Sequence, residues 1–299
     1  FVHLHVHTHY SLLDGLGKVE DLVSRAKELN MPALAVTDHG VMHGAVEFYL
    51  ECQKQGIKPI IGQEAYVARR KRIDKSAAND TRPYHLILLA KNYEGYLNLI
   101  KLTSLANLEG YYYKPRMDRE ILSRYSKGLI ATTACLASET SRLILDKDDK
   151  KLAETIGEYR EIFGKDNYYL ELQHHPSIPE QQVVNQRLKA IAQKENLPLI
   201  ATNDVHYVRS EDSVPHDMLV CIQTGKLVSD TNRMIYSGDF VLKSAEDFQR
   251  AFNDVPEALS NTLRITDMVN LELPLGQNFL PNFPLPEGET EESYLKKIS

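Results

Sequence analysis

The N-terminal stretch Phe1-Val-His-Leu-His-Val-His-Thr-His-Tyr-Ser-Leu-Leu-Asp-Gly15 decides how the rest of the chain is interpreted. Its apolar and imidazole side chains alternate, and a β-strand places alternate residues on opposite faces. We therefore predict a strand over Val2–His7, with a packed apolar face and a row of histidines on the other face. Neutral imidazole is the commonest protein ligand for metal ions, so the stretch indicates a metal site. An expression tag would lack the interleaved Val and Leu residues.

Composition places the chain among ordinary globular proteins. Of its 299 residues, 42% are hydrophobic and 25% are charged, as is typical of soluble domains. No apolar run approaches the roughly 18 residues of a membrane helix, so no membrane partner is expected. Cys52, Cys135 and Cys221 are odd in number and widely spaced, which is typical of reduced cysteines in a cytoplasmic protein. The net charge of −6 predicts that any contact with nucleic acid is local.

Short apolar runs alternate with amphipathic helical runs from the N-terminus to about residue 225. Besides Val2–His7, the predicted strands are Ala33–Thr37, Ile60–Val67, His85–Ala90, Leu129–Thr133, Tyr168–Gln173 and Leu199–Thr202. Helical spacing of apolar residues occurs near residues 19–29, 44–55, 93–107, 149–163 and 180–195. This α/β order predicts βα units with a largely parallel sheet, and seven strands fit a closed barrel as well as an open sheet.

In such barrels the functional groups gather where the strands end. The candidate metal ligands that end a predicted strand or follow one are His5, His7, Asp14, His39, Glu64, His175, Asp204 and His206. His85 is the exception, because it begins its predicted strand. Nine ligands are too many for one tetrahedral zinc ion and would serve two or three ions. No cysteine belongs to the set, which weighs against a structural zinc finger.

Imidazole and carboxylate ligands together suit zinc first, with manganese or iron as alternatives. Three divalent ions would bring six positive charges against three negative charges from Asp14, Glu64 and Asp204. The site would be locally cationic within an acidic protein, and therefore suited to phosphate.

The same residues resemble the motifs of the polymerase and histidinol phosphatase (PHP) superfamily. These motifs are His5-x-His7, Thr37-Asp-His39-Gly40, Glu64, His85, His175 and Asp204-x-His206. Longer stretches resemble the N-terminal domain of bacterial replicative DNA polymerase III α subunits, namely Tyr10-Ser-Leu-Leu-Asp-Gly15, Met31-Pro-Ala-Leu-Ala-Val-Thr-Asp38, Gly56-Ile-Lys-Pro-Ile-Ile-Gly62 and Ala201-Thr-Asn-Asp-Val-His-Tyr207. The resemblance covers residues 1 to about 270.

The resemblance implies a distorted seven-stranded (βα)7 TIM-like barrel that holds up to three divalent metal ions at the C-terminal ends of its strands. By analogy, Glu64 would bridge two ions. The ligands of the first ion would be His5, His7 and Asp204, those of the second His85 and His175, and those of the third Asp14, His39 and His206.

The resemblance also implies a metal-dependent phosphodiesterase with 3′–5′ exonuclease activity, in which Glu64, His7 and Asp204 are catalytic through the ions. Its partners would be a DNA 3′ end, the remainder of the polymerase α subunit and other replisome subunits. Two alternatives stay open: a histidinol-phosphatase-like phosphomonoesterase, and a metal-stabilised scaffold without catalysis. Polymerisation itself would lie outside this chain.

Two basic segments bear on substrate binding. Gly110–Met117 mixes tyrosines with cations, a combination typical of single-strand binding, and a packed loop is an equal alternative. Within it, Lys114 and Arg116 are the candidates for phosphate contacts. The polar loop 68–82 contains Arg69-Arg-Lys-Arg72, which we interpret as a solvated loop, with contacts to a phosphate backbone as the alternative.

We expect a barrel domain over residues 1–270 and an extended linker over 271–299 that leads toward a polymerase palm domain absent from this chain. The missing initiator Met and a helix that stops at Ser299 indicate a piece of a longer protein. Close to the candidate site, we expect His3 to pack in the core. Asp38 is expected to hydrogen-bond near the ligands rather than to coordinate metal.

Overall fold

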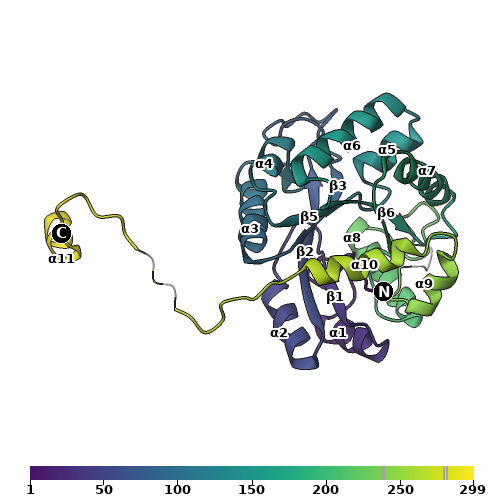
Figure 1. Cartoon of the computed structure of the whole chain (residues 1–299), viewed down its shortest axis with the longest axis horizontal. Coiled ribbons are helices and arrows are strands. Elements are labelled where there is room, and N and C mark those ends of the chain that lie inside the picture. The colour runs from purple at the N-terminus through teal and green to yellow at the C-terminus, as the bar shows by residue number, and fades with distance from the viewer. Residues whose placement is uncertain (237–239, 279, 281) are drawn as a thin grey trace.

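A curled sheet forms the centre of the molecule (Figure 1). The computed structural model describes residues 1–236, 240–278, 280 and 282–299. The strands of the wall follow one another in the order β1 (Ala33–Val36), β2 (Lys58–Val67), β3 (Tyr84–Ala90), β5 (Leu129–Thr132), β6 (Tyr168–Gln173) and β7 (Leu199–Thr202). A short strand, β4 (Arg116–Met117), pairs with β2 outside this wall.

Residues 2–7 lie between β7 and β1, where they complete the distorted seven-stranded barrel that we expect. On one side the amides of Ala35 and Thr37 donate to the carbonyls of His3 and Val6, at 3.0 and 2.8 Å. On the other side the His7 amide donates to the carbonyl of Val205 at 2.7 Å.

The prediction of a regular strand over Val2–His7 is wrong in one respect. The two paired carbonyls, of His3 and Val6, are three residues apart, whereas their donor amides, of Ala35 and Thr37, are only two apart. The pairing register therefore shifts by one residue within this segment. The Val6 amide donates to Thr37 Oγ1 at 2.8 Å instead of to a ladder carbonyl. The segment is therefore extended but has no continuous strand pairing.

β3 runs antiparallel to both of its neighbours, whereas the pairs β1–β2, β5–β6 and β6–β7 are parallel. Residues 68–83 join β2 to β3 without a helix, and a parallel connection needs such a crossover. The largely parallel sheet is thus confirmed except at β3. Because β3 is reversed, its first residues lie at the edge where the parallel strands end. This reversal explains why His85 begins its strand and still faces Tyr66 in β2.

Helices surround the curled sheet (Figure 1). The five predicted helical runs are confirmed as α1 (Val19–Glu28), α2 (Ala45–Gln55), α3 (Tyr93–Leu108), α6 (Asp149–Phe163) and α7 (Pro179–Glu195). The apolar spacing does not mark α4 (Arg119–Arg124), α5 (Glu139–Leu145), the 3-10 turn η1 (Ser210–Asp212), α8 (Ser213–Thr224), α9 (Ala245–Ala251) or α10 (Glu257–Met268). Most of these are short, and a short helix gives periodicity little length in which to show itself.

Strands β2, β3, β5, β6 and β7 each contribute residues to two different apolar clusters. In β3, Leu86 and Leu88 pack with Leu99 and Leu102 of α3. Alternate residues such as Ile87 belong to a second cluster with residues from β1, β2, β5 and β7. This period of two fixes which polar residues of the strands turn inward near the strand ends.

The chain leaves the barrel after α10 and runs out to α11 (Glu291–Ile298), as Figure 1 shows. The buried apolar clusters reach as far as Leu271, and α11 has no buried side chain. The division into a barrel over 1–270 and a linker over 271–299 stays a prediction, and residues 279 and 281 lie outside the described ones. No helix of the described residues is long and apolar enough to cross a membrane.

Candidate metal centre

A compact cluster of imidazoles and carboxylates lies where the parallel strands end. Neighbouring members approach one another through nitrogen–oxygen distances of 3.7 Å or less. The structure brings together eight of the nine expected ligands: His5, His7, Asp14, His39, Glu64, His85, Asp204 and His206.

The Glu64 carboxylate lies at the centre of the cluster and is fully buried. Its Oε1 atom lies 2.8 Å from His85 Nδ1 and 3.4 Å from His5 Nε2. Its Oε2 atom lies 2.6 Å from His39 Nδ1 and 3.5 Å from His7 Nε2. Each oxygen thus faces two imidazoles, so the carboxylate lies between two pairs of potential ligands.

Three atoms on one side of Glu64 form a small triangle. His5 Nε2 lies 3.2 Å from His7 Nε2. Asp204 Oδ1 lies 3.0 Å from the first nitrogen and 3.1 Å from the second. Two ligands of a tetrahedral zinc ion lie about 3.3 Å apart, because each bond is about 2.0–2.1 Å long. The triangle therefore has the size of three ligands on one ion.

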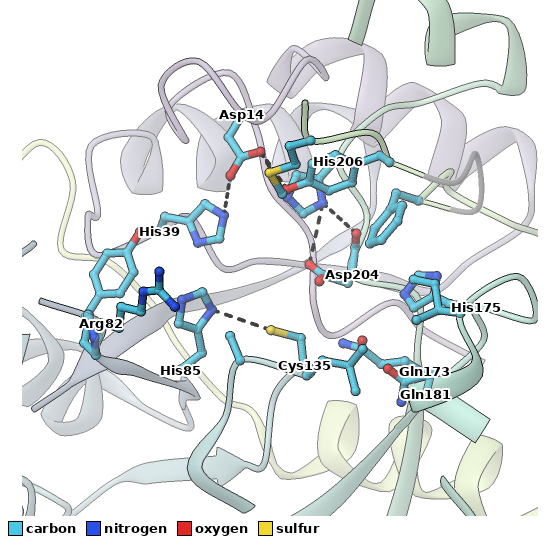
Figure 2. Close-up of a pocket in the computed structure, with 18 of the residues that line it drawn as sticks. Asp14, His39, Arg82, His85, Cys135, Gln173, His175, Gln181, Asp204 and His206 are labelled. Atoms are coloured by element: carbon cyan, nitrogen blue, oxygen red, sulfur yellow. Dashed lines mark hydrogen bonds and ion pairs between the residues drawn. The ribbon is translucent and has the colours of Figure 1, made fainter. Parts of the chain in front are cut away.

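Asp14 joins two further imidazoles on the cavity side of the cluster (Figure 2). Its Oδ2 atom lies 2.9 Å from His39 Nε2, and its Oδ1 atom lies 3.7 Å from His206 Nε2. The Tyr236 hydroxyl donates to Oδ1 at 3.0 Å. The two nitrogens of His39 therefore face two carboxylates, Asp14 and Glu64.

Several buried atoms of the cluster make no hydrogen bond of regular geometry within the described structure. They are both ring nitrogens of His39, Glu64 Oε2, Asp204 Oδ1 and His206 Nε2. Buried polar atoms are nearly always hydrogen-bonded, and coordination to an ion would satisfy all of these at once. Nitrogen and carboxylate donors suit zinc, manganese and iron. The residues present therefore fit a centre of more than one divalent ion.

The mutual charges shift the pKa values of these groups in opposite directions. Burial opposes the charged form of His39, but Glu64 and Asp14 outweigh it and raise the pKa of His39 to about 10. Burial and the nearby imidazoles of His39 and His206 lower the pKa of His7 to about 3. Without metal, protons on some imidazoles thus hold the carboxylates together. Metal binding requires those imidazoles to be neutral.

Glu171 is a supporting residue that the sequence pattern places on the inward face of β6 but does not assign to the site. Its buried carboxylate lies 2.7 Å from His5 Nδ1. It also accepts hydrogen bonds from Thr202 Oγ1 at 2.6 Å and from Gln173 Nε2 at 3.1 Å. A carboxylate behind a ligating histidine fixes its tautomer and ring orientation, so Glu171 directs His5 Nε2 into the cluster.

The structure agrees with both expectations for the neighbouring residues. His3 is buried away from the cluster, where its ring meets that of Phe248 edge to face with centroids 5.3 Å apart. Asp38 accepts a hydrogen bond from Ser11 Oγ at 2.7 Å. That hydroxyl lies 3.1 Å from His7 Nδ1, so Asp38 orients His7 through Ser11.

Cys135 belongs to the cluster, although no cysteine is expected among the metal ligands from the sequence. Its Sγ atom lies 3.5 Å from Glu64 Oε1 and 3.5 Å from His85 Nδ1. In a tetrahedral zinc site, bonds of about 2.3 Å to sulfur and 2.0 Å to nitrogen place those two atoms about 3.5 Å apart. Cys135 lies three residues after the end of β5, so the strand-end rule marks it once it is applied to cysteine as well.

His175 lines the same cavity but lies apart from that pair. Figure 2 shows His85 and Cys135 beside each other, with His175 on the opposite side of the cavity. The His175 ring stacks on Phe240 with centroids 4.2 Å apart. Among the described residues, the tightest three-residue groups are His7/His39/His206, His5/His7/Glu64 and His39/Glu64/His85, which include neither His175 nor Cys135. The pairing of His175 with His85 on one ion stays a prediction.

Arg116 requires a correction. Its side chain is fully buried, and its guanidinium donates to four backbone carbonyls, those of Gly110 at 2.9 Å, Asp80 at 3.3 Å, Arg72 at 2.8 Å and Asp74 at 2.7 Å. The prediction that Arg116 contacts phosphate is therefore wrong. The motif shows a cation next to tyrosines, but only the fold shows that this cation ties two loops together.

A cavity of about 560 Å³ opens over the cluster and is lined by Asp14, His39, His85, Asp204 and His206 among others. Three exposed cations also line it, namely Arg82, Lys114 and Arg142. Lys114 Nζ lies 5.2 Å from the centroid of the Tyr66 ring. The size and the charge of this cavity suit a phosphate-bearing group of nucleotide size.

Comparisons with known proteins agree with this geometry. The PHP domain family matches residues 3–175. The chain is 46% identical to the DNA polymerase III subunit alpha of Borreliella burgdorferi over 303 residues, which cover 100% of this chain and 26% of that protein. It is 45% identical to the subunit of the same name from Thermus aquaticus over 311 residues, with 100% and 25% covered. The chain spans about a quarter of the length of these curated relatives.

A solved structure also aligns with the barrel. It is a two-domain protein from Bacteroides vulgatus containing a predicted PHP-like metal-dependent phosphoesterase, with a TM-score of 0.44 and 15% identity over 76% of this chain and 55% of that one.

Proposed function

The chain belongs to the PHP domain family, and on that premise we propose that it is the PHP domain of a bacterial replicative DNA polymerase III α subunit and acts as a metal-dependent 3′–5′ exonuclease. One observation carries the proposal. The buried Glu64 carboxylate faces four imidazoles, and two of these, His39 and His85, line an open cavity. Such a centre has both ligands for ions and access for a substrate.

We assign up to three divalent ions to the cluster, zinc first, with manganese or iron as alternatives. Glu64 would bridge two of them. The first ion would take His5, His7 and Asp204, the second His85 with Cys135 in place of His175, and the third Asp14, His39 and His206. The triangle of His5, His7 and Asp204 supports the first site, and the distances from Cys135 to His85 and Glu64 support the second.

When bound, divalent ions at such a site activate water and neutralise the charge of a phosphodiester. The residues of the chain supply the remaining parts. Glu64, His7 and Asp204 hold the ions, and Glu171 and Asp38 keep the ligands in place. Lys114, Arg82 and Arg142 would bind the phosphate oxygens of the substrate at the cavity mouth. No side-chain nucleophile is needed.

A DNA 3′ end is the proposed substrate because the curated relatives named above are subunits of DNA polymerase III. The same similarity makes the remainder of an α subunit, and through it other replisome subunits, the proposed partners. A cytoplasmic location follows from these proposals and from the unpaired cysteines.

The direct test is digestion of a 3′-labelled single strand and of a duplex with a mismatched 3′ end. Each would be incubated with the purified chain in chelator, in zinc and in manganese, beside the Glu64→Ala variant. Stepwise loss of 3′ nucleotides that requires metal and disappears in the variant is expected.

Other results would favour the alternatives. Metal bound at the cluster without cleavage of any substrate would favour a metal-stabilised scaffold. Turnover of a small phosphomonoester without attack on DNA would favour a histidinol-phosphatase-like enzyme. Full metal-dependent digestion by Glu64→Ala would overturn the assignment of the centre.

A further inference from the structure

A second cavity adjoins the one over the metal centre. It measures about 560 Å³ and is lined by Arg69, Arg70, Ala78, Asn79, Thr81, Arg82, Tyr84 and Lys151; we call it the basic groove. Thr81 and Arg82 line both cavities, so the two meet at these residues. Figure 2 shows Arg82 beside His85, at the edge of the metal cavity. A basic path therefore leads from the cluster onto the loop 68–83.

Three cations of the basic groove, Arg69, Arg82 and Lys151, form no ion pair with any carboxylate among the described residues. Arg69 is nevertheless held in place. Its Nε donates to the carbonyl of Arg82 at 2.8 Å, and its Nη1 donates to the Tyr84 hydroxyl at 3.2 Å. Its guanidinium carbon lies 4.5 Å from the centroid of the Tyr84 ring. The charge of Arg69 is thus positioned but uncompensated, as a ligand-binding cation should be.

The other basic residues of the run Arg69–Arg72 are used differently. Arg70 pairs with Asp80 at 2.5 Å. Arg72 pairs with three carboxylates, those of Glu109, Asp118 and Glu120, at distances from 2.7 to 3.2 Å. Lys71 is exposed and lines neither cavity. Of these four residues, only Arg69 brings uncompensated positive charge to the groove.

We propose that the basic groove binds the phosphodiester backbone of a single strand whose 3′ end enters the metal cavity. Proteins that hold single strands use a positively charged groove that follows the backbone, together with aromatic side chains on which bases stack. In a chain of net charge −6, uncompensated cations in two joined cavities form a local site of this kind. A small phosphomonoester would occupy the metal cavity alone and would not contact the groove.

This inference rests on the proposed function, because the strand is placed by its 3′ end. The strand segment next to the 3′ end would pass Arg82, and the nucleotides farther toward the 5′ end would reach Arg69 and Lys151. The groove therefore binds substrate away from the reacting phosphate and should affect long strands more than short ones.

The test measures binding without hydrolysis. A fluorescein-labelled single strand of twelve thymidines, with phosphorothioate linkages at its 3′ end to resist cleavage, would be titrated with metal-loaded protein at several salt concentrations. Each lost phosphate contact lowers the slope of log affinity against log salt by about 0.7. The double variant Arg69→Ala/Lys151→Glu should bind more weakly, with a slope reduced by about 1.4.

Matched variants keep the result interpretable. Lys71→Glu changes charge on the same loop but outside the groove, and it should bind the strand as the unmodified protein does. Lys151→Glu alone should weaken binding without harming the fold, because Lys151 is exposed and its helix cap uses only its backbone amide. Arg69→Lys should restore most of the affinity that Arg69→Ala loses. Hydrolysis of bis-p-nitrophenyl phosphate should be unchanged in Lys71→Glu, because Lys71 lines neither cavity.

Four outcomes are informative. Unchanged affinity and salt slope in the double variant would overturn the proposal that the groove binds the strand. An equal loss of affinity in Lys71→Glu would overturn it too. Tighter binding of a duplex than of the single strand would overturn the choice of strand. Absence of any hydrolysis, with the contrast between Lys151→Glu and Lys71→Glu retained, would support the groove and overturn the exonuclease activity.

Discussion

At the scale of single residues, Cys135 and His175 distinguish two ligand sets for the ion beside His85. Cys135 Sγ lies 3.5 Å from both Glu64 Oε1 and His85 Nδ1, whereas His175 stacks on Phe240. We expect Cys135→Ser to lower the metal content by about one ion per chain, because zinc binds thiolate strongly. His175→Ala should leave the content unchanged. Elemental analysis of the purified variants checks this, and the opposite pattern would restore His175 as the ligand.

The charges of the cluster predict that its metal binding depends on pH. Glu64 and Asp14 raise the pKa of His39 to about 10, despite the opposing effect of burial. In the metal-free protein this histidine is therefore protonated at pH 7. The stability that its charged form contributes is fully present below its unfolded pKa and is lost as the pH rises through about 10. A metal must displace that proton, so zinc affinity should increase as the pH rises from 7.

Calorimetry at pH 7 in two buffers with different ionisation enthalpies measures the released protons. Unequal heats of zinc binding in the two buffers are expected. His7 should add nothing to this release, because its pKa is lowered to about 3 by burial and by its imidazole neighbours. Equal heats in both buffers would show that the ligands are already neutral, contrary to the raised pKa of His39.

At the scale of elements, Arg116 joins the loop 68–83 to the segment that leads into β4. Its guanidinium donates to four backbone carbonyls within the fold. Arg116→Met would leave buried acceptors without donors, and we expect a loss of about 3 kcal/mol or more in the free energy of unfolding. Urea denaturation measures this loss. Lys114→Met, at an exposed position two residues before Arg116, should cost less than about 0.5 kcal/mol.

A different result would support a role for Arg116 in substrate binding. If Arg116→Met kept its full stability and instead weakened single-strand binding, the guanidinium would have a ligand-binding role. The metal content of the folded variant should be unchanged in either case, because Arg116 lies outside the cluster.

At the scale of the whole molecule, the metal centre connects elements that are distant in the sequence. The members of the cluster come from the N-terminal segment, the residues after β1, strands β2 and β3, the residues after β5 and those after β7. An ion that binds only the folded state stabilises it by about 4 kcal/mol at a thousand times its Kd. In a chain of this size, each kcal/mol raises Tm by about 2–4 °C.

We therefore expect chelation to lower Tm by about 8–16 °C. Differential scanning calorimetry with and without chelator measures the shift. Glu64→Ala is the matched control, because a chain that has already lost its bridging carboxylate should respond little to the chelator. An equal shift in that variant would mean that the stabilising ion binds elsewhere.

The sequence by itself determined the local features of this protein. Alternation in Val2–His7 and the apolar spacing of five helices are periodic signals that neighbouring residues carry. Polar residues at or just after the ends of apolar strands also identified seven members of the cluster, because parallel strands end at a common edge. These inferences hold because each depends on a few residues in a row.

Only the tertiary structure decided how distant segments meet. The reversed direction of β3 brings His85 to the common edge, and that direction comes from pairing with β2 and β5 rather than from the residues of β3. The position of Cys135 beside Glu64, and the burial of Arg116 among backbone carbonyls, likewise depend on contacts between separate segments. Such contacts leave no period in the sequence, because the side chain that completes each of them lies tens of residues away.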